Sequence, residues 1–180
     1  TSALTASGTV GSVFTYATTA SNLPTSYSAT GLPSGLSINT TTGVISGTPT
    51  VAGNFNVSLS ATNETGTDTK TLVITLAQAN QVITFNTLSG KTYGDASFSL
   101  NGTSTSGLAL TYSSSNTAVA TISGNTVTIV GVGTTSITAS QSGDANYFAA
   151  SDVSQDLVVA KANQTITFNT LSDKNDTDGS

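Results

Sequence analysis

The residues that could perform acid–base, nucleophilic or metal chemistry are few. The chain holds nine carboxylates and four lysines, and it has neither histidine nor cysteine. Catalytic triads and Cys–His pairs need one of these missing residue types, and the common zinc sites need them too. A glycosidase needs two carboxylates in one cleft, whereas these carboxylates fall in predicted turns or at strand ends. We therefore predict that the chain is not an enzyme and has no catalytic, cofactor-binding or metal-binding residues.

Calcium is the alternative that the carboxylates leave open, because it binds several oxygen ligands and junctions between sandwich domains can supply them. The segment DKNDTDG at 173–179 resembles a calcium loop. When Gly179 is aligned with the turn glycine of an EF-hand, however, Lys174 occupies the first ligand position. We interpret the segment as a solvated acidic loop. Three carboxylates of the second unit could also be calcium ligands, namely Asp95, Asp144 and Asp152. Nothing in the sequence brings them together, so we expect them to cap turns.

The composition favours β structure and excludes several classes of partner. Only 7% of the residues are charged, 36% are hydrophobic, and the mean hydropathy is +0.09. Valine, isoleucine, threonine, tyrosine and phenylalanine supply much of the sequence, and these residues suit a pleated, half-buried surface. Without arginine and with four lysines there is no basic patch for nucleic acid or for anionic membranes. No run approaches the roughly 18 apolar residues of a membrane span, so we predict no membrane insertion.

An internal repeat sets the organisation of the chain. Residues 79–91 read ANQVITFNTLSGK and residues 162–174 read ANQTITFNTLSDK, with eleven of thirteen positions identical at an offset of 83 residues. This period is longer than the roughly 20–50 residues of solenoid or propeller repeats and fits a whole small sandwich. We predict a first unit at 1–77, a second unit at 78–161, and the truncated start of a further repeat at 162–180. Since the chain begins at Thr1 without a signal peptide, we expect it to be an excised piece of a larger protein.

Alternating apolar residues predict short strands in both units. In the first unit, alternation indicates strands over 55–61 and 72–76, with a hairpin turn at 63–68, and strands are also expected at 13–17 and 26–30. In the second unit, alternation falls at 108–112, 127–129, 137–139 and 157–159. Short strands at near-regular spacing, separated by Gly and Asn turns, are typical of a sandwich or barrel. The fold prediction is all-β, with two sandwiches end to end.

Two family resemblances make the fold prediction more specific. GLPSGLSINTTTGVISGTPT at 31–50, followed by GNFNVSLSATN at 53–63, resembles the Putative Ig domain of bacterial surface proteins, a cadherin-like sandwich. YSSSNTAVATISGNTVTIVGVGTTSITAS at 112–140 resembles the group 2 bacterial Ig-like domain of intimin- and invasin-type adhesins. The repeat as a whole is similar to repeats in giant surface proteins and secreted polysaccharide-degrading enzymes of gliding bacteria. The resemblance implies tandem immunoglobulin-like sandwiches that act as spacers, stalks or adhesin modules, with no shared catalytic residues.

Ligand binding by the chain itself is the second functional hypothesis. Ser- and Thr-rich strand faces could present hydroxyl groups to a sugar, but carbohydrate sites also use exposed aromatic rings. Tryptophan is absent, and Tyr93 and Tyr147 are the aromatic residues least clearly expected to be buried. An intramolecular isopeptide bond would need a buried lysine, whereas Lys70 and Lys161 flank predicted strands and are expected to be exposed.

The predicted function is therefore structural. We expect non-catalytic spacer and interaction modules of a large bacterial protein, extracellular or at the cell surface, such as an adhesin stalk or a linker in a polysaccharide-active enzyme. A carbohydrate- or surface-binding adhesin module, stabilised by calcium, is the alternative. The expected partners are neighbouring domains and an extracellular polysaccharide or surface ligand. The linkers at 77–80 and 159–162 are short and lack Gly and Pro, which predicts restricted swivelling and a semi-extended rod.

Overall fold

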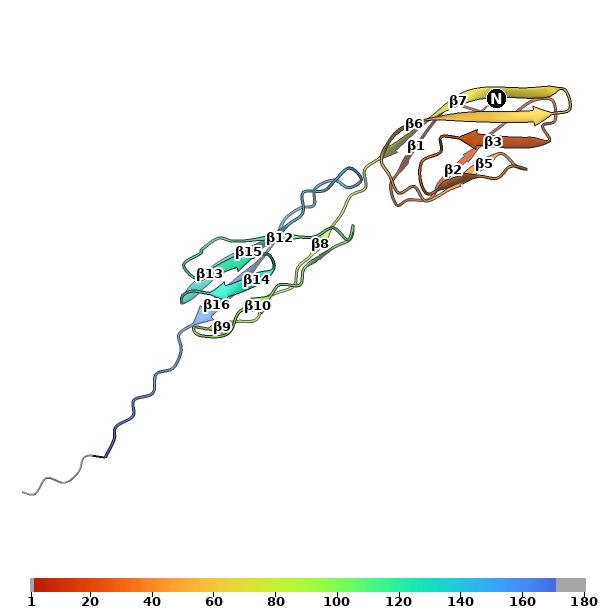
Figure 1. Cartoon of the computed structure of the whole chain (residues 1–180). Coiled ribbons are helices and arrows are strands. Elements are labelled where there is room, and N and C mark those ends of the chain that lie inside the picture. The colour runs from red at the N-terminus through yellow and green to blue at the C-terminus, as the bar shows by residue number, and fades with distance from the viewer. Residues whose placement is uncertain (1, 171–180) are drawn as a thin grey trace, which may run out of the picture.

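Two β-sandwiches follow one another along the chain, each with its own hydrophobic core. The structure, a computed structural model, describes residues 2–170, and these residues form strands β1–β16 and no helix. One buried cluster lies within residues 14–76 and the other within residues 83–159. Figure 1 shows the two units end to end, joined by a single crossing of the chain. The predicted all-β class and the tandem Ig-like sandwiches are thus confirmed.

The first unit packs a sheet of four strands against a sheet of three. The larger sheet has the order β1 (Thr5–Thr9), β7 (Gly66–Ala77), β6 (Gly53–Asn63), β3 (Ser26–Thr30). The smaller sheet has the order β2 (Phe14–Ala17), β5 (Val44–Gly47), β4 (Leu36–Ile38). β1 runs parallel to β7, and the other pairs are antiparallel.

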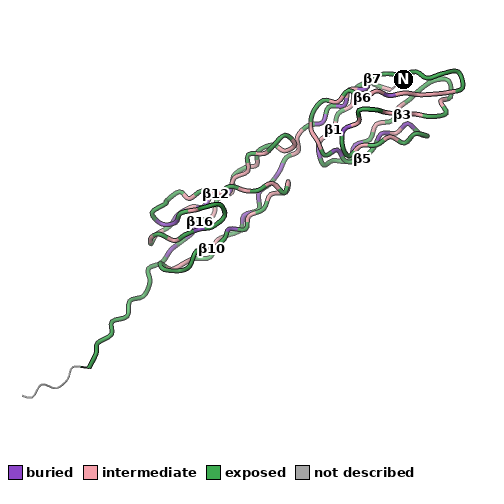
Figure 2. The backbone as a smooth tube through the Cα atoms, viewed as in Figure 1, coloured by how far each residue is buried: buried purple, intermediate pink, exposed green. Residues whose placement is uncertain are grey.

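The predicted alternation identifies strand residues that form the core of the first unit. Along β6, Val57 and Leu59 are buried, and along β7, Leu72, Ile74 and Leu76 are buried, while many of their neighbours face outward. Because side chains of a strand point alternately to opposite faces, one face of the long β6–β7 hairpin supplies much of this core (Figure 2).

The turn of this hairpin is shorter than predicted. β6 ends at Asn63 and β7 begins at Gly66, so Asp68, expected in the turn, lies in the strand. The Asn63 side-chain Oδ1 accepts hydrogen bonds from the backbone N–H groups of Thr65 (2.9 Å) and Gly66 (3.2 Å). This Asx-type contact closes the turn within two residues, which leaves the following residues free to pair.

The second unit repeats the arrangement with shorter strands. Its larger sheet has the order β12 (Thr111–Ser114), β15 (Gly133–Ser140), β16 (Val153–Ala160), β9 (Lys91–Thr92). Its other sheets are β10 (Phe98–Ser99), β14 (Thr126–Ile129), β13 (Ala120–Ser123), and the pair β11 (Thr103–Ser104) and β8 (Ile83–Thr84). The strand predicted over 108–112 begins only at Thr111, although Leu108 and Leu110 are half-buried, as their phase predicted.

The two copies of the repeated sequence differ in burial. In the second unit, Ile83 and Phe85 are buried in the core, at 5% and 4% exposure. Their counterparts Ile166 and Phe168 are 79% and 91% exposed, and residues 161–170 form no strand. No pairing of this segment with a neighbouring sheet edge is found within 162–170. Residues 171–180 lie outside the described part of the chain.

Candidate functional site

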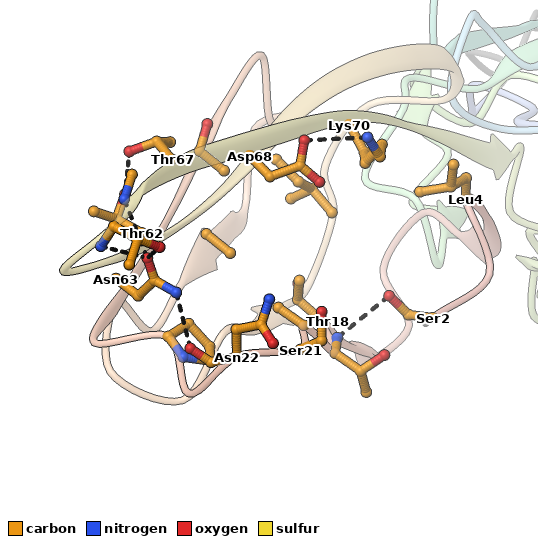
Figure 3. A pocket seen from close by; sticks show the side chains of 18 residues that line it. Ser2, Leu4, Thr18, Ser21, Asn22, Thr62, Asn63, Thr67, Asp68 and Lys70 are labelled. Atoms are coloured by element: carbon orange, nitrogen blue, oxygen red, sulfur yellow. Dashed lines mark hydrogen bonds and ion pairs between the residues drawn. The ribbon is translucent and has the colours of Figure 1, made fainter.

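A pocket lies at the end of the first unit that is remote from the second. This pocket has a volume of about 560 Å³ and lies between the N-terminal segment, the loop at 18–24 and the ends of β6 and β7 (Figure 3). Small polar side chains dominate the lining, which contains no aromatic ring. The buried hydroxyl of Thr18 has no hydrogen-bond partner. The pocket can offer hydrogen bonds to a hydroxylated ligand, but no ring on which a sugar could stack.

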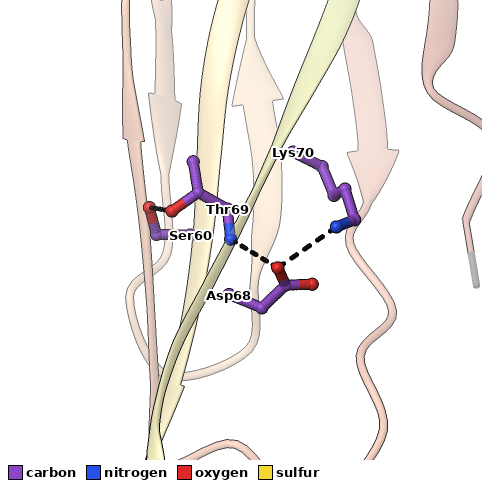
Figure 4. A network of polar contacts seen from close by, with 4 residues as sticks. All are labelled: Ser60, Asp68, Thr69 and Lys70. Atoms are coloured by element: carbon purple, nitrogen blue, oxygen red, sulfur yellow. Dashed lines mark hydrogen bonds and ion pairs between the residues drawn. The ribbon is translucent and has the colours of Figure 1, made fainter.

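One ion pair lies at the rim of this pocket. Lys70 Nζ approaches Asp68 Oδ1 to 3.1 Å, and the same oxygen accepts the Thr69 N–H at 3.0 Å (Figure 4). Both charged side chains are well exposed, at 61% for Lys70 and 75% for Asp68. An exposed pair of this kind contributes about 0–1 kcal/mol. We therefore assign it no structural role, and the exposure of Lys70 is as predicted.

Two of the three carboxylates expected to cap turns accept local hydrogen bonds, and for Asp152 no such bond is found within the described part of the chain. Asp95 Oδ2 accepts the Thr92 N–H at 2.8 Å, and Asp144 Oδ1 accepts the N–H groups of Asn146 and Tyr147 at 2.7 and 2.9 Å. Both are turn caps, as their sequence context predicted. Among residues 2–170, no three acidic side chains lie close enough together to hold a metal ion. The acidic segment at 173–179 lies outside the described residues.

The two candidate tyrosines do not form a common binding platform. Tyr93 is 51% exposed and lies beside the end of β16, where its N–H donates to Ala160 O at 2.9 Å. Tyr147 is half-buried and forms a parallel bridge with Ala79 at the start of the second unit. They therefore lie at opposite ends of this unit. Lys161 is exposed, as predicted.

The junction between the units contains the densest set of contacts that the sequence did not predict. The loop at 143–148, here called the junction loop, reaches from the second unit toward the linker (Figure 1). Ala79 donates to Asn146 O and accepts from the Phe148 N–H, both at 2.9 Å. Gln78 Nε2 donates to Asp144 O at 2.7 Å. The linker is thereby fixed to the second unit by side chain and backbone.

One hydrogen bond joins the two units directly. The Ala52 N–H, in the loop before β6, donates to Asn146 Oδ1 at 2.9 Å. On the other side of the crossing, Ala77 is the last residue of β7 and accepts the Val10 N–H at 3.1 Å. Ala77 is thus bonded to the first unit and Ala79 to the second, and only Gln78, whose side chain also bonds to the second unit, lies between them.

The junction loop is itself held in shape. Gly143 has φ +77°, and a Cβ there would lie 2.3 Å from Tyr147 O, so only glycine fits this close approach. The side-chain Nε2 of Gln81, which is only 6% exposed, donates to Phe148 O at 2.8 Å. The Asp144 cap completes the turn. These contacts hold Asn146 in the position from which its side chain accepts the Ala52 N–H of the first unit.

Sequence reasoning missed Asn146 and Gln81 because both are uncharged. The one available signal for Gln81 was its phase within the repeated motif, since Gln81, Ile83 and Phe85 are buried while the residues between them are exposed. Asn146 lies in a stretch with turn composition, SGDAN at 142–146, where asparagine ordinarily caps its own turn.

Comparison with known proteins gives similarities over parts of the chain. No curated protein matches it. Among solved structures, a putative alpha-galactosidase from Bacteroides fragilis is 30% identical over 44% of this chain and 19% of its own, with a TM-score of 0.41. Human protocadherin-24 EC1-2 is 12% identical over 88% of this chain and 96% of its own, with a TM-score of 0.43. A SusE-like surface polysaccharide-binding protein from Bacteroides thetaiotaomicron is 15% identical over 86% of this chain and 32% of its own, with a TM-score of 0.38.

The chain spans about a fifth of the length of the Bacteroides fragilis proteins it matches, 19% in each of two cases. Within residues 2–170 there is no helix that is long and apolar enough to cross a membrane. The family model described as Putative Ig domain matches residues 1–77, which confirms the family resemblance predicted for the first unit.

Proposed function

We propose that the chain is a non-catalytic spacer of a bacterial cell-surface or secreted protein, in which two sandwiches form one stiff rod. The observation that carries this proposal is the junction, where Ala77 is bonded into the first unit and Ala79 into the second. Domains of one chain move relative to each other by default unless their interface prevents it. Here Gln78 alone separates the two bonded residues, its side chain donates to Asp144 O in the second unit, and the Ala52–Asn146 bond resists bending away from the axis.

The surface of the rod suits such a role. Its exposed residues are mostly Ser, Thr, Asn and Gly, with 7% charged residues in the whole chain. An uncharged hydroxylated surface remains soluble and has few strong attractions for nucleic acid or anionic lipid. Projecting an attached module from a cell surface, as in an adhesin stalk, or separating the modules of a polysaccharide-active enzyme requires stiffness and reach rather than chemistry. The neighbouring domains would then be the principal partners, outside the cell.

Asn146→Ala tests the spacer proposal. The change removes the acceptor of the Ala52 N–H but keeps the backbone bonds of the junction loop. We expect a loss of about 1 kcal/mol of junction free energy, the net value of one hydrogen bond, and a clear gain in motion between the units. ¹⁵N relaxation measures this gain as separate tumbling times for the two units. Asn146→Asp keeps an oxygen acceptor and is the matched control. Equal tumbling in Asn146→Ala and the unmodified chain would count against the proposal.

Binding of a carbohydrate at the remote end is the second candidate function. The observation that favours it is the pocket of about 560 Å³, with the unpaired buried hydroxyl of Thr18 and the Asp68 carboxylate on its lining. A binding module at the far end of a rod would be well placed to meet an extracellular polysaccharide.

A glycan array separates the two functions. If the pocket binds a glycan, Asp68→Ala should weaken the signal at least tenfold, because a charge-assisted hydrogen bond contributes about 1.5–3 kcal/mol. Lys91→Ala, in the second unit, should leave it unchanged. Absence of binding to every glycan, or an Asp68→Ala signal equal to that of the unmodified chain, would exclude the pocket as a binding site and leave the spacer role alone.

A further inference from the structure

The far end of the second unit carries the same contact elements as the junction end of the first. At the junction, Gly53 begins β6 opposite Leu76, and Ala52, which precedes it, donates to the junction loop. At the far end, Gly133 begins β15 opposite Val159. The backbone φ angles of the two glycines are +139° and +140°. Val132 therefore occupies, in the second unit, the position that Ala52 occupies in the first.

The parallel strands agree with this equivalence. In the first unit, Thr9 pairs with Ala77, and the Val10 N–H donates to Ala77 O. In the second unit, Thr92 pairs with Ala160, and the Tyr93 N–H donates to Ala160 O. The corresponding residues are separated by 83 positions, as are the two copies of the repeated sequence. Strand pairing and sequence repetition thus give, independently, the same residue-by-residue correspondence between the junction end of the first unit and the far end of the second.

The linker residues follow in the same register. Ala79, which forms both backbone bonds to the junction loop, is the third residue after Leu76. Ala162 is the third residue after Val159, and it opens the same ANQ motif. Any unit that begins with this motif at Ala162 would place its own junction loop beside Val132. The exposed linker thus has the ANQ motif and the spacing of the one already engaged, with Lys161 in the place of Gln78.

This end of the second unit also exposes large apolar side chains. Tyr93, Val130 and Val132 are 51%, 46% and 45% exposed. Tyr93 and Val132 lie at the ends of strands that flank β16 in one sheet. In the first unit the residue at the position of Tyr93 is Val10, and it is only 4% exposed. The position of Tyr93 is thus covered in the first unit and open in the second.

We propose that this end, formed by Tyr93, Val132 and the backbone at Ala162, is a docking surface for the junction loop of another copy of the second unit. The Val132 N–H donates to the Asn146 side chain of the incoming copy. Ala162, which corresponds to Ala79, forms backbone hydrogen bonds to the junction loop of that copy, as Ala79 does in the junction already formed. The inference rests on the spacer function proposed above and specifies its partner. Arrays of second units then form a continuous stiff rod with one kind of joint.

The test extends the chain. Residues 79–161 are added directly after Lys161, and amide hydrogen exchange is measured by NMR. We expect the Val132 amide to exchange at least tenfold more slowly than in the 180-residue chain, and Asn146→Ala in the added copy alone to restore fast exchange. The Ala52 amide serves as the internal reference, because its own Asn146 is unchanged. Fast exchange at Val132 with a protected Ala52 would overturn the docking proposal alone. Fast exchange at both would overturn the spacer proposal as well.

Crosslinking gives a second, independent measurement of the same joint. The chain has no cysteine, so engineered pairs are unambiguous. Ala52→Cys with Asn146→Cys is the reference pair at the existing junction. Val132→Cys with Asn146→Cys of the added copy should form a disulfide with comparable yield, and Val132→Cys with Ser151→Cys of the added copy is the displaced control. A reference pair that closes while the Val132 pair gives no more than the displaced control would overturn the inference.

Discussion

Leu72→Ala is expected to unfold the first unit and leave the second unit folded. Leu72 is fully buried among residues of the first core, and the cluster of the second unit contains none of them. Truncating a buried leucine to alanine costs about 2–5 kcal/mol, a large share of the roughly 5–15 kcal/mol that stabilises a domain. Calorimetry should show the transition of the first unit shifted to lower temperature or lost, with the transition of the second unit in place.

Leu157→Ala is the matched control, since Leu157 is equally buried in the core of the second unit. It should shift the other transition and spare the first unit. The junction contributes little to either core, because a single hydrogen bond joins the units directly. If either variant moved both transitions by the same amount, the two sandwiches would unfold as one cooperative unit. The account of two sandwiches with independent cores would then be wrong.

Gly35→Ala is expected to be the most damaging change outside the two cores. Gly35 has φ +90°, and a Cβ there would lie 2.0 Å from Thr48 O and 3.1 Å from the Cα of Pro49. A non-glycine residue costs about 1–2 kcal/mol in this left-handed region, and the clash with backbone atoms adds to it. We expect the first unit to lose about 3–5 kcal/mol, in the range of the severe backbone substitutions, measured by urea denaturation.

Gly11→Ala separates the cost of the left-handed backbone conformation from the cost of the clash with backbone atoms. Gly11 also has a positive φ, +76°, but no atom lies within 4 Å of the position that a Cβ would take there, so only the backbone term applies. It should cost about 1–2 kcal/mol. Equal effects of the two substitutions would show that close approach at Gly35 is not what requires glycine there.

This close approach explains the motif that identified the first unit. Leu36, after Gly35, pairs with Gly47 in the β4–β5 ladder, and the Thr48 N–H donates to Gly35 O at 3.1 Å. The Leu-Pro-Ser-Gly-Leu element at 32–36 therefore leads into β4, the Gly-Val-Ile-Ser-Gly-Thr-Pro element at 43–49 contains β5, and their backbones meet at Gly35 and Gly47. Local sequence could predict such a fold because the constraint is local: each glycine is needed by the strand beside it.

The junction could not be predicted in the same way. The short linker without Gly or Pro indicated limited motion, but its hydrogen bonds depend on a loop far away in the sequence, at 143–148. Neither the composition nor the periodicity of the sequence around Ala52 and Asn146 indicates that these residues bond to each other. Long-range polar contacts between loops leave no pattern in a single sequence, whereas buried strands leave alternation.

Residual dipolar couplings of the unmodified chain test the central claim most directly. They report the orientation of each backbone N–H relative to one alignment frame. If the junction holds the units as one stiff rod, a single alignment tensor will fit the couplings of both sandwiches. If the units swivel about the linker, each will need its own tensor with a different magnitude, and that result would contradict the stiff-rod junction.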